Sequence, residues 1–283
     1  MLDLRGATLP GRVGKPNEDA FAILPSLAVV ADGATSPPLL GDGCIHGPAW
    51  YARRLVASVV AAHADAPDSK PVDLLSLAIE ATTAAHADTC DLGHPGTPSS
   101  TVAIMTFQPA SVRWLVLGDC TMVIDAGDGI DVVCDERLSN TSEAERAAVK
   151  VPGGASNEAE YGRRIEALVV AQRSHRNRPG GFWVAAADPQ AAYEAYTGEV
   201  GDACNGRINR AALLTDGASR IVDIYRTLTW NTALDLMDTA GPTGLLCKLR
   251  TLERADQTAH IYPRIKLSDD ATAVFATWTA END

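Results

Sequence analysis

The spacing of hydrophobic residues along the chain separates predicted strands from predicted helices. Short apolar or alternating runs predict strands, and these runs are 21–24, 27–31, 98–107, 112–120, 121–124, 182–187, 211–214 and 271–278. Apolar positions three and four residues apart predict helices, which are 48–60, 72–89, 139–173 with a break at Gly153 and Gly154, 218–225, 229–240 and 242–255. The chain is therefore predicted to mix strands and helices along its whole length.

Two of these patterns also predict which strands are neighbours, and a third pattern predicts a loop. Runs 21–24 and 27–31, joined by Pro25 and Ser26, predict a hairpin. Runs 98–107, 112–120 and 121–124 predict a meander of three strands. The stretch from Thr197 to Asn209, rich in glycine and polar residues, predicts an exposed loop. We hypothesise that this loop acts as a flap beside the cleft formed by the acidic residues described next.

Acidic residues recur where the predicted strands begin or end. Leu27–Ala31 runs into Asp32-Gly33-Ala34, and residues 211–214 run into Asp216-Gly217-Ala218 after one threonine. Further acidic points are Glu18 and Asp19 before residue 21, Asp269 and Asp270 before residue 271, and Asp119 after Gly118. The predicted hairpin places Glu18, Asp19 and Asp32 on neighbouring strands.

A single Asp-Gly after a strand usually marks only a turn, because glycine tolerates a positive φ and aspartate bonds its own backbone. Carboxylates fixed to strands in four or five separated segments are instead typical of an oxygen-ligand site for a hard divalent cation. Such a cation would also offset the repulsion between neighbouring carboxylates. The pattern therefore predicts a metal site.

Composition and charge narrow the function classes. The 283 residues suffice for one large domain, and the absence of a linker favours a single domain over 1–283. The net charge of -12 argues against a nucleic-acid binder, which needs a basic face. Neither a signal peptide nor a membrane span is indicated, so we expect a protein of the cytoplasm.

The six cysteines form no CxxC pair and no zinc-like spacing, which predicts free thiols in a reducing compartment. His46 is a candidate substrate contact, whereas His63, His86 and His94 are expected to be structural or exposed. Trp50 lies in helical phase and is expected in the core.

Together the acidic motifs resemble a known family. The motifs are Asn17-Glu18-Asp19-Ala20-Phe21, Asp32-Gly33, Ser100-Thr101, Gly118-Asp119-Cys120, Asp216-Gly217 and Asp269-Asp270-Ala271-Thr272. In order and spacing they resemble the metal-dependent PPM, or type 2C, serine/threonine phosphatases of bacteria, over residues 6–278. The resemblance implies an α+β fold, an α/β/β/α sandwich of two mostly antiparallel sheets flanked by helices.

The resemblance also implies two Mn²⁺ or Mg²⁺ ions, with an optional third. Asp32 corresponds to the carboxylate that bridges the ions, and Asp216 and Asp269 to ligands of one of them. Glu18 and the carbonyl of Gly33 correspond to ligands of the other, and Asp119 lies near the third. Asp19 and Asp270 correspond to acids behind these ligands.

The implied chemistry needs no side-chain nucleophile. Two ions activate a water and neutralise an in-line phosphoryl transition state, so Asp32 and Asp216 count as catalytic through the ions that they hold. The implied partner is a phosphorylated protein.

The substrate side departs from the family. Bacterial members usually carry an arginine four residues before the glutamate, where this chain has Gly14. Arg12 or Lys15 is the predicted phosphate contact, although lysine cannot reproduce bidentate recognition. The glycine-rich turn usual after the first Asp-Gly is replaced by Ala34–Pro38, and Asp270 stands where asparagine is frequent. Two alternatives therefore stay open, a phosphatase of a small phosphorylated molecule and a regulatory or binding module without turnover.

Overall fold

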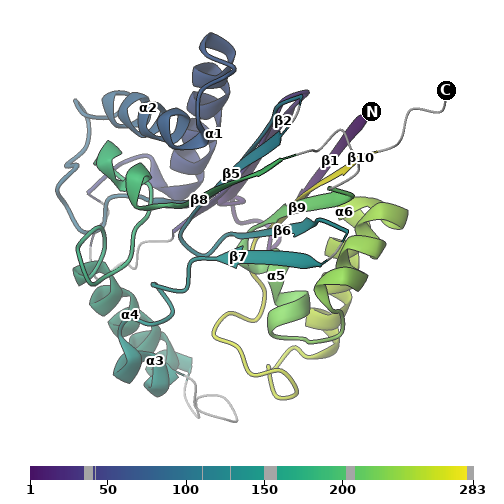
Figure 1. Cartoon of the computed structure of the whole chain (residues 1–283). Helices are drawn as coiled ribbons and strands as arrows, with labels where there is room; N and C mark the ends of the chain where they lie inside the picture. The colour runs from purple at the N-terminus through teal and green to yellow at the C-terminus, as the bar shows by residue number, and fades with distance from the viewer. Residues whose placement is uncertain are drawn as a thin grey trace.

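The computed structural model describes residues 1–34, 41, 43–109, 111–127, 129–149, 158–201 and 208–278 (Figure 1). Its strands are β1 Leu2–Leu9, β2 Asp19–Leu24, β3 Leu27–Gly33, β4 Ser100–Phe107, β5 Ser111–Leu117, β6 Thr121–Asp125, β7 Ile130–Cys134, β8 Tyr196–Gly201, β9 Arg210–Leu214 and β10 Ala271–Trp278. Its helices are α1 Gly47–Asp65, α2 Pro71–Ala84, α3 Glu143–Val149, α4 Glu158–Ser174, α5 Asp216–Asp223 and α6 Trp230–Ala255, with a 3₁₀ helix at Pro189–Glu194. The predicted break at Gly153 and Gly154 and most of the turn Ala34–Pro38 lie outside the described residues.

The strands form two antiparallel sheets of five strands each. One sheet has the order β1-β10-β9-β6-β7, and the other has the order β2-β3-β4-β5-β8. The predicted hairpin of β2 and β3 is confirmed, with Asp19 opposite Asp32.

Three apolar layers hold the sheets and helices together. Side chains from α1 and α2, such as Leu55 and Ile79, pack on one side of the β2-β3-β4-β5-β8 sheet. Val30 and Leu213 belong to the layer between the two sheets, and Met237 of α6 belongs to the layer under the other sheet. Figure 1 shows α1 and α2 on one outer side and α5 and α6 on the opposite one. The predicted α/β/β/α sandwich is confirmed.

The predicted meander of three strands is wrong. β4 and β5 pair, but β6 pairs with β7 and β9 in the other sheet. The chain changes sheets at Gly118. This residue has φ 77°, which glycine adopts without strain, and it lies so close to Thr101 that a Cβ would stand 2.4 Å from the threonine side chain. Cys120 and Met122 then pack between the sheets. This crossing places Asp119 where the two sheets meet.

The predicted exposed loop at 197–209 is also wrong for its first part. Tyr196–Gly201 forms β8, which pairs with β5, and residues 202–207 lie outside the described part of the chain. The glycine that suggested a loop, Gly198, instead makes room for a neighbour, because a Cβ there would lie 2.3 Å from the indole of Trp114. The flap hypothesis loses its basis in this segment.

Residues 182–187 do not form the predicted strand, since Ala185 makes only an isolated bridge to Ser100. In α6, the expected break is confirmed at Gly241, which has φ 70° and precedes Pro242.

Candidate metal centre

The sandwich brings the predicted carboxylates to one edge. Asp32 lies near the end of β3, and Asp119 lies in the link from β5 to β6. Asp216 is the first residue of α5, directly after β9, and Asp269 precedes β10. Because β3 lies against β9 and β10 of the other sheet, the strand ends that carry these residues meet. The clustering that the sequence predicted is therefore present.

The carboxylates act on one another electrostatically. Burial raises the pKa of Asp32 well above its usual value, and the charges of Asp19, Asp216 and Asp269 raise it further. Burial and the charge of Asp216 raise the pKa of Asp119 to about 7. These carboxyl groups hold their protons strongly because burial and the repulsion between their negative charges both disfavour the ionised form. A bound cation would replace the protons and offset that repulsion.

Asp19 provides the clearest test of whether a cation fits. Its Oδ2 accepts a hydrogen bond from the hydroxyl of Thr215 at 2.8 Å, whereas its buried Oδ1 has no hydrogen-bond partner. Burial raises the pKa of Asp19 to about 7. A buried carboxylate oxygen without a partner costs free energy that a cation, or a water bound to one, would recover.

The acids are not arranged around a single point. In the described part of the chain, they do not bring three ligand atoms within 4.8 Å of one another. The orphaned oxygen of Asp19 and the mutual repulsion of the buried carboxylates are both features that bound hard cations would relieve.

Two cations of the protein itself lie among the acids. Arg220 donates to Oδ2 of Asp269 at 2.6 Å, and the ammonium of Lys266 lies 2.9 Å from Oδ1 of the same carboxylate. Burial alone would raise the pKa of Asp216, but Arg220 and Lys266 hold it below its usual value. The two cations thus favour the ionised form of Asp216, whereas burial and the charge of Asp216 raise the pKa of Asp269 despite them. The side chain of Lys266 is half exposed.

Sequence reasoning missed both cations, although their spacing gave a signal. Arg220 stands four residues after Asp216 on α5, and Lys266 stands three residues before Asp269. Residues three or four apart are neighbours on a helix, but residues 264–270 form no helix. Helical periodicity could therefore reveal only the pair of Asp216 and Arg220.

Asp270 ties the N-terminal ligand segment to the C-terminal one. Its Oδ1 accepts from the backbone N–H of Gly11 at 2.7 Å, and its Oδ2 accepts from that of Glu18 at 2.7 Å. The carbonyl of Glu18 in turn accepts from the N–H of Gly33 at 3.0 Å. Glu18 and Gly33 are thereby held side by side, as a shared ion would require.

Arg12 and Lys15, the predicted phosphate contacts, lie on the exposed turn after β1. This turn begins beside the acids, because Gly11 packs so closely on Asp269 that a Cβ would lie 2.5 Å from its carbonyl carbon. Gly14 has φ 83°, a conformation that an arginine would adopt only with strain, so this turn would have to change shape to accept the arginine. Contact of Arg12 or Lys15 with phosphate stays a prediction.

Comparison with known families identifies the architecture. The family model described as protein phosphatase 2C matches residues 11–252. The chain belongs to the protein phosphatase 2C family. The predicted enzyme class, a metal-dependent phosphatase that uses two Mn²⁺ or Mg²⁺ ions, is thereby confirmed.

Solved structures of other phosphatases share this fold. The serine/threonine phosphatase PstP/Ppp of Mycobacterium tuberculosis is 17% identical, with a TM-score of 0.56 and 99% of each chain covered. The catalytic domain of PstP in complex with two manganese ions is 15% identical, with a TM-score of 0.53 over 98% of this chain and 97% of that one. Stp1 of Staphylococcus aureus is 12% identical, with a TM-score of 0.55 over 99% and 96%. No curated protein matches the chain significantly in sequence.

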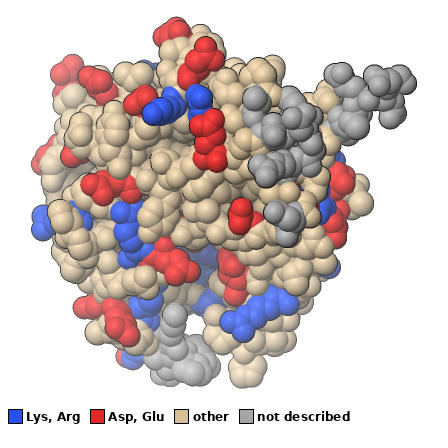
Figure 2. All heavy atoms as spheres, viewed as in Figure 1, with Lys and Arg blue, Asp and Glu red and all other residues tan. Residues whose placement is uncertain are grey.

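Two further observations concern the surface and the helices. On the face shown in Figure 2, acidic side chains are interspersed with basic ones, and a continuous basic surface is not seen there. Among the described residues, the helices are too short or too polar to span a bilayer.

Proposed function

We propose that this phosphatase removes phosphate from phosphoserine and phosphothreonine in proteins at the acidic centre described above. In this proposal Asp32 would be shared by two Mn²⁺ or Mg²⁺ ions, Asp216 and Asp269 would hold one of them, and Glu18 and the Gly33 carbonyl would hold the other. Asp119 holds an optional third ion. The observation that carries the assignment is that Asp32, Asp119, Asp216 and Asp269, from separate strand ends, lie close enough for their charges to act on one another, and that the neighbouring Asp19 has a buried oxygen without a hydrogen-bond partner. The manganese pair in the PstP structure supports the metal.

When bound, two such ions supply a hydroxide near neutral pH and neutralise charge on the phosphoryl group. The residues of the chain prepare the site for them. Arg220 and Lys266 hold the pKa of Asp216 below its usual value, which favours its charged form. Asp270 and the pairing of β2 with β3 hold Glu18, Gly33 and Asp32 in register, so the ligands are positioned before the ions arrive.

A phosphatase of a small phosphorylated molecule is the second candidate. It is favoured by the turn at residues 11–16, where Gly14 replaces the usual arginine and both Arg12 and Lys15 are exposed. The regulatory module without turnover has less support, because the metal-binding carboxylates are retained. A location in the cytoplasm, a single domain over 1–283 and the lack of a nucleic-acid partner stay predictions.

The test compares p-nitrophenyl phosphate with a phosphothreonine peptide, each with Mn²⁺, Mg²⁺ or chelator. Metal-dependent turnover of both is expected. Turnover of the small ester alone would favour the second candidate, and turnover of neither, by a folded protein that binds Mn²⁺, would favour the regulatory module.

The ligand assignment is tested by Asp32→Ala and Asp216→Ala. Both should abolish Mn²⁺-dependent hydrolysis in a folded protein, whereas Asp238→Ala, which removes a surface ion pair with Arg5, should not. Full activity in either of the first two variants would refute the two-ion assignment.

A further inference from the structure

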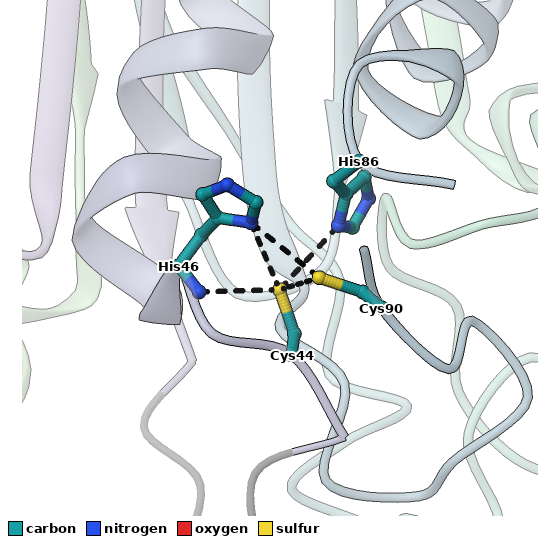
Figure 3. Close-up of side chains that lie close together, drawn as sticks. All are labelled: Cys44, His46, His86 and Cys90. Carbon is teal, nitrogen blue, oxygen red and sulfur yellow. Dashed lines mark hydrogen bonds between the residues drawn. The ribbon is translucent and has the colours of Figure 1, made fainter. Parts of the chain in front are cut away.

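Two cysteines and two histidines meet at a place distinct in chemistry from the acidic centre. Cys44 and His46 lie just before α1, and His86 and Cys90 lie just after α2 (Figure 3). Their ligand atoms all lie within 4.8 Å of one another. The spacing along the chain did not predict this cluster, since it contains no CxxC pair and no zinc-like spacing. The two halves, Cys-x-His and His-x₃-Cys, are 40 residues apart and meet because α1 packs against α2.

The separations fit a tetrahedral ion. Nδ1 of His46 lies 3.5 Å from Sγ of Cys44 and 3.4 Å from Sγ of Cys90, and Nδ1 of His86 lies 3.4 Å from Sγ of Cys44. Zinc bonds of about 2.3 Å to sulfur and about 2.0 Å to nitrogen give a sulfur–nitrogen edge of about 3.5 Å. The two sulfurs, 3.0 Å apart, would separate to about 3.8 Å around the ion. Of the six edges of the tetrahedron, three already have the expected length, the sulfur–sulfur edge has to open, and the remaining two are no longer than 4.8 Å.

The ligand types and their burial also favour zinc. Two thiolates and two neutral imidazoles balance the charge of Zn²⁺ and are softer than the oxygens of the acidic centre. Cys44 and His86 are buried, and His46 and Cys90 are half-buried. Four protein ligands leave no open position for a substrate, so the chemistry of the set is that of a structural site.

The surrounding residues hold the imidazoles in place. Trp50, on the first turn of α1, stacks on His46 with ring centroids 4.2 Å apart and lies tilted against His86 at 5.2 Å. Beside the cluster, the N–H of Asp91 donates to the carbonyl of Gly43 at 2.7 Å. The two segments are thus joined by packing and a backbone hydrogen bond as well as by the four side chains.

We propose that Cys44, His46, His86 and Cys90 bind one structural Zn²⁺ ion, which fastens the start of α1 to the end of α2. His46, the N-cap of α1, provides no side-chain cap, so the ion supplies an anchor for this helix end. Gly33 packs against the carbonyl of Pro48 on the first turn of α1, and the N–H of Ala34 donates to Ser99 at 2.9 Å. The zinc site therefore supports the segments that flank Gly33, and its existence does not depend on the phosphatase assignment.

The first experiment uses the full chain, purified without chelator, and measures zinc by plasma mass spectrometry. One zinc per chain is expected. After zinc removal and addition of Co²⁺, the protein should show the intense visible absorption and thiolate-to-cobalt charge transfer of a tetrahedral site with cysteine ligands. An ion bound only at the acidic centre would lack the thiolate band and would overturn the proposal.

The second experiment compares Cys90→Ser and Cys44→Ser with Cys247→Ser, whose thiol is exposed on α6. The first two should lose at least about nine-tenths of the zinc, and the control should keep it. Equal zinc in all three would refute the assignment. Since a variant could fail to fold, the intact mass of the native protein is also measured. A Cys44–Cys90 disulfide, seen as the loss of two hydrogens without bound zinc, would likewise refute it.

Discussion

The two hydrogen bonds that Asp270 accepts offer a quantitative test of how the acidic centre is assembled. Asp270→Ala removes both acceptors and leaves the N–H groups of Gly11 and Glu18, on the other side of the site, without their partner. Hydrogen bonds to a charged group contribute about 1.5–3 kcal/mol each, so the loss of two should lower the free energy of unfolding by about 3–6 kcal/mol. For a chain of this size that corresponds to a fall of about 6–24 °C in the unfolding midpoint.

The same substitution should weaken metal binding, because the backbone of Glu18 is placed by Asp270. Loss of a group that orients a ligand typically costs about 10- to 100-fold in metal affinity, and we expect a Mn²⁺ dissociation constant raised by at least about tenfold. Asp270→Asn keeps one oxygen acceptor and should show about half of the stability loss.

Urea unfolding in chelator measures the change in the free energy of unfolding, and calorimetric titration with Mn²⁺ measures the change in the dissociation constant. Asp238→Ala is the matched control, since its ion pair with Arg5 is exposed and should contribute at most about 1 kcal/mol. If Asp270→Ala unfolds at the same urea concentration as this control, the two hydrogen bonds do not hold the centre together as argued.

Three further predictions concern the same region. Without metal, the free energy of unfolding should fall as the pH rises from about 4 to about 7, because folded Asp19 keeps its proton up to a pKa of about 7 while the unfolded chain releases it near 3.8. The urea midpoint in chelator should show this fall, and Asp19→Asn should make the fall smaller. A midpoint that rises with pH would contradict the prediction. Gly217→Ala should cost about 1–3 kcal/mol in urea unfolding, because its Cβ would lie 1.8 Å from the carbonyl oxygen of Asp270, whereas Gly162→Ala, in open space on α4, should not destabilise. Lys266→Met should tighten Mn²⁺ binding about three- to fivefold in calorimetry, since it removes the ammonium that competes for Asp269 while Arg220, the larger influence on Asp216, still favours the ionised form of that ligand; weaker binding would show that the lysine helps to hold the site.

The strand ends and their carboxylates could be predicted because the signal is local. An apolar run followed by Asp-Gly marks both Asp32 and Asp216, and the register of a two-residue hairpin fixes Asp19 opposite Asp32. The assignment of β6 to the second sheet could not be predicted, since the pattern of residues 121–124 is the same whichever sheet the strand joins. Only the positive φ of Gly118 and the packing of Cys120 between the sheets decide it.

Contacts between distant segments were missed for a related reason. Cys44 and His46 gain their metal-binding geometry from His86 and Cys90, which the packing of α1 on α2 brings beside them. Gly198 was interpreted as a loop residue because glycine is common in loops, but here its missing side chain admits Trp114 within the sheet. In each case the deciding contact joins residues that are far apart in sequence.

The most direct test of the central claim is anomalous diffraction from a crystal of the full chain grown with Mn²⁺. Two manganese peaks about 3.5–4 Å apart are predicted, with Asp32 between them, Asp216 and Asp269 on one and the Gly33 carbonyl on the other. No peak among these residues, or manganese only at another place in the protein, would contradict the account.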